Sequence, residues 1–166
     1  MRTSTVALAA ALAVVSITTS LNGQKPDEAI DGRSLELLEQ GRALKAAGDL
    51  DGAVDALETA VAVDPRNRIA FVTLAQVAEA RDLPGKAIRL YREALILEPN
   101  DVAALRGQGE ALVAKGAIAR ARDNLAKIRT LCKSGCTEAT ALAAVIAKGP
   151  PVATAAVVTK PTVVKE

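Results

Sequence analysis

The chain of 166 residues contains no histidine and no tryptophan, and its only aromatic residues are Phe71 and Tyr91. The absence of histidine removes the commonest general base, a common metal ligand and the usual partner of a catalytic serine or cysteine. Because aromatic rings are so scarce, a core has to be built from alanine, leucine, valine and isoleucine. That mixture favours closely packed helices.

The chain also lacks a predominance of charge of one sign. Its 21 basic and 19 acidic residues are interspersed, and no basic stripe alternates with aromatic side chains. A nucleic-acid-binding surface usually has such a stripe, so we expect no nucleic-acid partner.

Catalytic and cofactor motifs are missing as well. The sequence has no glycine-rich phosphate loop, no nucleophile elbow and no cluster with metal-ligand spacing. Asp49 and Asp51 could form an acid and base pair, but they flank an expected exposed turn, where solvated carboxylates are the simpler interpretation. We therefore predict that the protein is not an enzyme and has no catalytic residues, no metal site and no cofactor.

Residues 1–23 have the layout of a secretory signal peptide, because Arg2 precedes an apolar run over residues 6–17 and small polar residues follow. A signal peptide predicts a periplasmic or secreted protein. The first alternative is an uncleaved anchor, since residues 3–24 carry no charge and are just long enough to span a bilayer. That anchor would hold the rest of the chain at a membrane outside the cytoplasm, and we expect membrane contact only in that case. A cytoplasmic protein with an unusual N-terminus is the second alternative.

A repeat of 34 residues organises the middle of the chain. Residues 34–67 superpose on residues 68–101, and a third copy occupies residues 102–135. In the first two copies the paired residues are Ala53 with Ala87, Leu57 with Tyr91, Ala60 with Ala94, and Pro65 with Pro99. Prolines and glycines recur together with the alanines, so chance periodicity does not explain the pattern.

Within each copy, apolar and small residues recur every three or four positions, as an amphipathic helix requires. The pattern is interrupted once per copy, near Gly48, over residues 82–85 and at Gly116. Each copy is therefore predicted to form a helix, a short turn and a second helix. The repeated alanines would let the two antiparallel helices approach closely.

These residues resemble the tetratricopeptide repeat. The matching positions are Leu37, Gly41, Leu44, Ala53, Leu57, Ala60 and Pro65 in the first copy, and Phe71, Leu74, Ala75, Ala78, Ala87, Tyr91, Ala94 and Pro99 in the second. The resemblance implies an all-α fold, a solenoid of three helical hairpins closed by a C-terminal capping helix. It points to a small exported bacterial protein of this family. The third copy departs from the pattern, with Ile128 in place of alanine and Lys133 in place of proline.

The repeats set the remaining boundaries. Residues 24–33 are expected to be a linker and residues 34–148 the repeat domain, whose capping helix covers residues 137–148 with Thr137 as its N-cap. Gly149, Pro150 and Pro151 end that helix. Residues 149–166, which have no helical period, are predicted to be a disordered tail.

In this family the first helix of each hairpin lines a concave face that receives a peptide or a partner helix. Carried over to this chain, the resemblance implies a groove of mixed charge that binds a protein or peptide partner. The predicted groove residues are Leu38, Arg42, Lys45, Val72, Gln76, Glu79, Arg106, Glu110 and Val113.

The family also contains members that hold a chaperone's C-terminal carboxylate with a clamp of lysine, asparagine and arginine. Leu38, Arg42, Ala103 and Gly107 occupy the corresponding places here, and asparagine is absent from them. We therefore predict that the chain does not bind a chaperone tail.

The only two cysteines, Cys132 and Cys136, stand where the third copy would have its closing proline turn. In an exported protein they are expected to form a disulfide that clasps the capping helix. The function predicted is a non-enzymatic protein-protein interaction scaffold in the cell envelope. Two alternatives stay open, namely a thiol redox or metallochaperone role through these cysteines, and a membrane-anchored structural subunit of an envelope complex.

Overall fold

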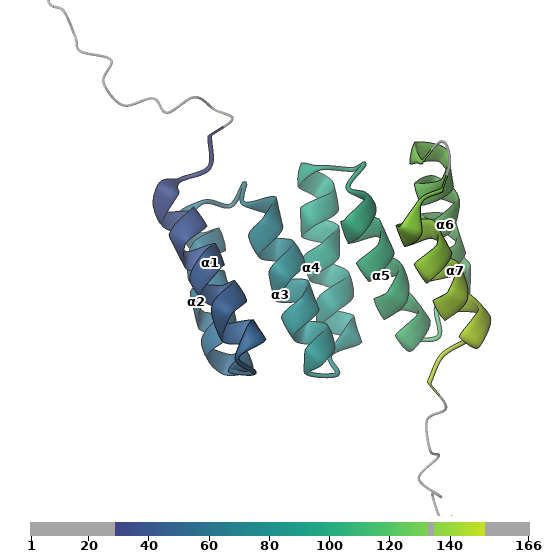
Figure 1. Cartoon of the computed structure of the whole chain (residues 1–166), viewed down its shortest axis with the longest axis horizontal. Helices are drawn as coiled ribbons and strands as arrows, with labels where there is room; N and C mark the ends of the chain where they lie inside the picture. The colour runs from purple at the N-terminus through teal and green to yellow at the C-terminus, as the bar shows by residue number, and fades with distance from the viewer. Residues whose placement is uncertain (1–28, 133–134, 152–166) are drawn as a thin grey trace, which may run out of the picture.

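The computed structural model describes residues 29–132 and 135–151, which contain seven α-helices and no strand (Figure 1). The helices are α1 (Gly32–Ala46), α2 (Leu50–Val63), α3 (Arg68–Ala80), α4 (Pro84–Leu97), α5 (Val102–Ala114), α6 (Ile118–Leu131) and α7 (Thr137–Lys148). The segment predicted to be a signal peptide or anchor, residues 24–28 of the linker and residues 152–166 of the tail lie outside the described residues. Within the described part, no helix has the length and apolarity needed to cross a membrane.

The helices form two layers (Figure 1). The first helices of the hairpins, α1, α3 and α5, lie side by side with α7 in one layer, and α2, α4 and α6 lie behind them. The all-α solenoid of three hairpins followed by a capping helix is thereby confirmed.

The hairpin turns recur with the 34-residue period. Gly48, Asp82 and Gly116 each adopt a positive φ, of 83°, 53° and 76° respectively. At each of these turns two backbone N–H groups bond back to the last turn of the preceding helix, as from Gly48 N to Lys45 O and from Asp49 N to Leu44 O. The predicted interruptions are therefore the turns that reverse the chain.

Side chains cap four of the helix starts, at Asp31, Asp49, Asn67 and Asp101. Because Asp31 accepts a hydrogen bond from the amide of Arg33 at 2.8 Å, α1 begins at Gly32. The linker predicted over residues 24–33 is therefore too long by its last two residues, which belong to α1.

Small residues bring the two helix layers together. Ala53, Ala60, Ala87 and Ala94 are fully buried, and the larger side chains of Leu57 and Tyr91 fill the space between hairpins. Gly41 shows how close the contact is, because a methyl group there would lie 2.4 Å from Leu57 Cγ. No side chain larger than hydrogen fits at this position unless Leu57 moves.

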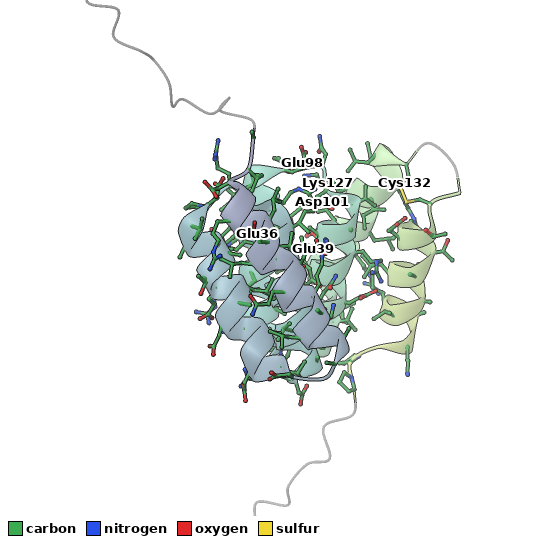
Figure 2. All side chains as sticks on the ribbon, turned by 60° about the vertical axis from the view of Figure 1, so that its left-hand side comes forward. Glu36, Glu39, Glu98, Asp101, Lys127 and Cys132 are labelled. Carbon is green, nitrogen blue, oxygen red and sulfur yellow. A yellow bond between two sulfur atoms is a disulfide. The ribbon has the colours of Figure 1, made fainter. Side chains whose placement is uncertain are left out.

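Buried polar groups join successive repeats. Ser34 Oγ donates to the carbonyl of Ala60 at 2.7 Å, and Asn67 Nδ2 donates to Ser34 Oγ at 2.8 Å. One repeat later Arg68 forms an ion pair with Asp101, the N-cap of α5, which Figure 2 labels. These bonds tie the start of a helix to a neighbouring repeat and so restrict the angle between hairpins.

The carboxylate of Asp64 makes the same kind of link at the first junction. It accepts hydrogen bonds from the Arg66 side chain at 3.0 Å and from the amide of Asp31 at 2.9 Å. The Arg66 hydrogen bond, followed by that of Asp31, lowers the pKa of Asp64 to about 2, so this carboxylate is ionised at neutral pH.

The connection between α6 and α7 holds both cysteines. Cys132 is the C-cap of α6 and Cys136 is the N-cap of α7, so the prediction that Thr137 caps this helix is wrong. Their Cα atoms are 5.7 Å apart, within the range that a disulfide requires, and Figure 2 labels Cys132 at this point. On α7 only Leu142 is fully buried, and it packs against Gly109 of α5.

The contact at Gly41 can be tested by Gly41→Ala. Alanine favours a helix by about 1 kcal/mol over glycine, but its methyl group would overlap Leu57, and overpacking of this kind costs about 1–3 kcal/mol. Thermal unfolding should show a lower Tm. The control Gly85→Ala, in a helix where nothing lies near the added methyl group, should show an unchanged or higher Tm. Equal shifts in both variants would contradict the close contact.

Candidate functional site

The nine predicted groove residues come from the first helices of the three hairpins. Each of α1, α3 and α5 contributes three of them, at the same positions of the 34-residue repeat. Since these helices lie side by side in one layer (Figure 1), the residues share one surface, which we call the groove face together with the neighbouring part of α7.

The polar members are linked to one another or to neighbouring side chains. Lys45 Nζ of α1 donates to Gln76 Oε1 of α3. On α5, Arg106 Nη1 donates to Glu110 Oε1 at 2.9 Å, with both side chains partly exposed. On α1, Arg42 pairs at 2.5 Å with Glu39, which Figure 2 labels. The groove face therefore carries paired polar side chains on all three helices, here called the polar network, which can exchange these bonds for bonds to a partner.

The apolar members behave differently. Leu38 and Val72 are 3% and 7% exposed and belong to the cores of the first and second hairpins. Their assignment to the groove is therefore corrected, because side chains needed to fill the space between helices are not available to a partner. The assignment of Val113 is corrected for the same reason, because it is 2% exposed and belongs to a buried cluster, although it also borders a cleft on the groove face.

Glu79 is a partly buried carboxylate of the network. The hydroxyl of Tyr91, which is 2% exposed, donates to Glu79 Oε2 at 2.8 Å. Burial raises the pKa of Glu79 above its ordinary value, and the negative charge of Glu110 adds to this, while the Tyr91 hydrogen bond and the charges of Arg106 and Lys45 act in the opposite direction. Keeping Glu79 ionised in the folded protein therefore costs free energy, because its carboxylate is partly removed from water.

Clefts open beside these side chains. One of about 280 Å³ lies at Arg106, Thr137 and Glu138, between α5 and α7. A second of about 160 Å³ is lined by Glu79, Asp82 and Glu110, among others. A third of about 360 Å³ begins at Glu110 and Val113 and continues to Val145 and Pro151. Each of the three clefts is lined by at least one residue of α5.

Asp82 and Glu138 were missed by the sequence prediction. Glu138 lies on α7, which packs on α5 as a fourth first helix would, 34 residues further along the chain. Extending the repeat register from α5 to residues 137–148 would have drawn attention to α7 as part of the groove face. Asp82 gives no such signal, because it is a turn residue.

The places of the carboxylate clamp do not offer the donors that a clamp needs. Leu38 is in the core, and Gly107 is buried under Tyr91, where an added methyl group would lie 2.3 Å from Tyr91 Cζ. Among residues 29–132 and 135–151, no three acidic or cysteine side chains gather closely enough to hold a metal ion. The arrangement is suited to hydrogen bonds and ion pairs with an extended chain.

Comparisons with known proteins agree with the repeat architecture. A sequence model described as "Tetratricopeptide repeat" matches residues 38–101 and 72–132, which together make up more than half of the chain. A search of curated proteins found no match.

Solved structures share the fold. The first TPR of Spaghetti (RPAP3) bound to the HSP90 peptide SRMEEVD is 22% identical, with a TM-score of 0.65, covering 70% of this chain and 91% of that one. The Sgt2 TPR domain from Aspergillus fumigatus is 21% identical, with a TM-score of 0.66, covering 75% and 83%. The P58(IPK) TPR domain is 27% identical, with a TM-score of 0.62, covering 69% of this chain and 32% of that one.

The desolvated carboxylate predicts a pH-dependent effect of Glu79→Gln. Because the pKa of Glu79 is higher in the folded state, folding of the native protein loses stability as pH rises through the range between its unfolded and folded pKa values. Glutamine can still accept the Tyr91 hydrogen bond without carrying a charge. Thermal unfolding should therefore show a higher Tm for the variant at pH 7, and the gain should vanish below about pH 4.

Tyr91→Phe serves as the comparison for this prediction. It removes the donor and leaves the half-buried carboxylate without its hydrogen bond, so the Tm should fall at pH 7 by the equivalent of about 1–3 kcal/mol. A Tm gain for Glu79→Gln that stays constant between pH 4 and pH 7 would contradict the burial of a charged Glu79.

Proposed function

The chain belongs to the tetratricopeptide repeat family, and we propose that it is a non-enzymatic protein-interaction scaffold that binds a peptide or partner segment on its concave surface. The observation that carries the proposal is the set of paired polar side chains along the groove face, from Arg42 and Lys45 on α1 to Arg106 and Glu110 on α5. The hydrogen bonds and ion pairs among these side chains lie at the protein surface, where each contributes little free energy. A bound segment can replace them at little cost.

The partner that we propose is not the C-terminal tail of a chaperone. The first TPR of Spaghetti (RPAP3) is bound to an HSP90 peptide that ends in Glu-Val-Asp. Here Leu38 and Gly107, at two places of the clamp, supply no side-chain donor. The mixture of Arg42, Lys45 and Arg106 with Glu79 and Glu110 instead fits a segment with both charges and some apolar contacts.

We further propose that the protein acts in the cell envelope, as a periplasmic or secreted protein. The support is the composition of residues 1–23, in which a basic residue is followed by an apolar run and small polar residues. Membrane anchoring through this segment is the alternative. Cell fractionation, with the mass of the mature chain, distinguishes the two, since cleavage leaves a shorter chain in the soluble envelope fraction.

A structural disulfide between Cys132 and Cys136 is part of the same proposal. The pair joins the C-cap of α6 to the N-cap of α7, and both cysteines pack against a buried cluster that includes Ile128 and Leu142. Both cysteines are partly buried, and this packing favours a clasp over a reactive thiol pair, which needs free access to solvent.

Thiol titration of the natively purified protein tests the clasp. We expect no free thiol before denaturation, slow reduction by a mild reductant, and unchanged partner binding in Cys132→Ser/Cys136→Ser, which should differ only by a lower Tm. Rapid reduction with loss of a thiol-dependent activity would instead support the redox alternative.

The binding proposal is tested by capture of envelope proteins on the immobilised mature chain. Arg42→Ala/Arg106→Ala removes one cation from each end of the network, and we expect captured partners to be retained about tenfold less strongly. The control Arg89→Ala/Arg92→Ala removes two exposed cations from α4, in the other layer, and should bind as the native protein does. Equal binding by all three proteins would refute the groove assignment.

A further inference from the structure

The end of the solenoid has a surface that the interior repeats do not leave open. In the interior, Leu112 of α5 and Ala121 of α6 share a buried cluster, against which Ile88 of α4, Ile118 of α6 and its N-cap Ala117 also pack. The second helix of each hairpin packs on its own first helix and on the first helix that follows, as α4 packs on α3 and α5. One repeat later, α7 takes the place of a first helix, and no second helix among the described residues covers the groove between α6 and α7.

An open cleft of about 590 Å³ occupies this place. Leu125, Ala126, Ala143 and Ile146 form its floor, and Arg122 and Arg129 of α6 stand beside it. Ile146 lies 34 residues after Leu112, so this part of the floor is equivalent to a residue that packs against α6 in the repeat before. We name it the terminal cleft.

The turn after α7 cannot be made as the other hairpin turns are. They use a left-handed residue at positions 48, 82 and 116, and the N–H of that residue donates to the carbonyl three positions earlier. The equivalent position is Pro150, whose ring holds φ near −65° and which has no N–H to donate. The chain instead adopts a positive φ one residue earlier, at Gly149, with an extended ψ of −179°. The hairpin geometry of the other repeats is therefore not available at this turn.

The charge beside the cleft indicates what would fill it. Arg122 and Arg129 stand where the interior groove has Ile88 and Leu95. Both arginines are exposed, and within the described part of the chain neither forms an ion pair, unlike Arg106 on α5. They are seven residues apart, or about two turns and 10.5 Å along one face of α6. A helix packed here would place its own side chains at the same spacing opposite two unpaired guanidinium groups.

We propose that the terminal cleft docks an acidic amphipathic helix of a partner protein, which takes the place of a fourth second helix. Small apolar residues of that helix would contact Ala126, Ala143 and Ile146, as Ala121 contacts Leu112 one repeat earlier. Carboxylates two turns apart would pair with Arg122 and Arg129. A second folded copy does not provide such a helix, because α2, the acidic second helix, buries its Ala53 and Ala60 in its own hairpin. This surface lies on α6 and α7, apart from the polar network of the groove face.

Two peptides from the chain itself provide matched probes. Residues 49–64 form an acidic second helix with five carboxylates and no cation, and residues 117–131 form a basic second helix with four cations and one carboxylate. They share small or apolar residues at the positions of Leu50, Ala53, Leu57, Ala60 and Val63, and differ at Val54 and Val61, where the basic peptide has Arg122 and Arg129. Fluorescence anisotropy of each labelled peptide, titrated with the full chain, should show saturable binding of the acidic peptide and at least about tenfold weaker binding of the basic one.

Variants place the binding in the cleft. Arg122→Glu/Arg129→Glu should weaken the acidic peptide at least about tenfold and improve binding of the basic peptide, which a merely structural role would not do. Ala126→Trp, at an exposed position, should block the floor without changing charge. The control Arg89→Glu/Arg92→Glu should stay within about twofold of the native chain, and circular dichroism melts should confirm that each variant folds.

Three results would overturn the proposal. The first is equal weakening by the α4 control, which would mean non-specific attraction to positive charge. The second is tighter peptide binding after truncation at Pro151, which would assign the cleft to residues 152–166 of the same chain. The third is a concentration-dependent dimer that Ala126→Trp abolishes, which would assign it to a second copy.

Discussion

Close approach of neighbouring helices is the constraint on which the rest of the structure depends. At Gly41, Gly107 and Gly109, an added methyl group would lie within 2.7 Å of a side chain from another helix. Those side chains, Leu57, Tyr91 and Leu142, are among the most buried of the chain. A core with almost no aromatic rings can be dense only if large aliphatic groups face positions without a side chain. The 34-residue repeat places small residues and large aliphatic residues at the positions where neighbouring helices have to pack closely.

The same close packing determines which side chains of the first helices remain available to a binding partner. Apolar side chains of the first helices, such as Leu38 and Val72, are drawn into the space between helices, and the groove face is left to polar groups. Where one of these, Glu79, lies over the Tyr91 hydroxyl, it is partly desolvated and its pKa is raised. The face therefore recognises a partner through exchangeable hydrogen bonds and ion pairs more than through buried apolar area.

The solenoid ends by a departure from its own repeat. Cysteines replace the proline turn before α7, and Pro150 replaces the left-handed turn residue after it. Leu142 over Gly109 closes the groove-side contact of α7 with α5, while the other side of α7 borders the terminal cleft. Capping is thus partial, and its open part carries Arg122 and Arg129 of α6, which form no ion pair within the described residues.

The sequence by itself determined the fold class, the three hairpins and the place of α7, because the period of small residues, glycines and prolines reports directly which helices must touch. The resemblance to the tetratricopeptide repeat predicted which helices form the groove face, and the repeat register then gave the equivalent position on each of them. Only the tertiary structure decided that Leu38 and Val72 belong to the core, that Asp82 and Glu138 border clefts, and that Arg122 and Arg129 flank an open cleft. The reason is physical. The exposure of a side chain and its hydrogen-bond or ion-pair partners depend on which residues of the neighbouring repeat pack against it. The local periodicity of a sequence does not show which residues those are.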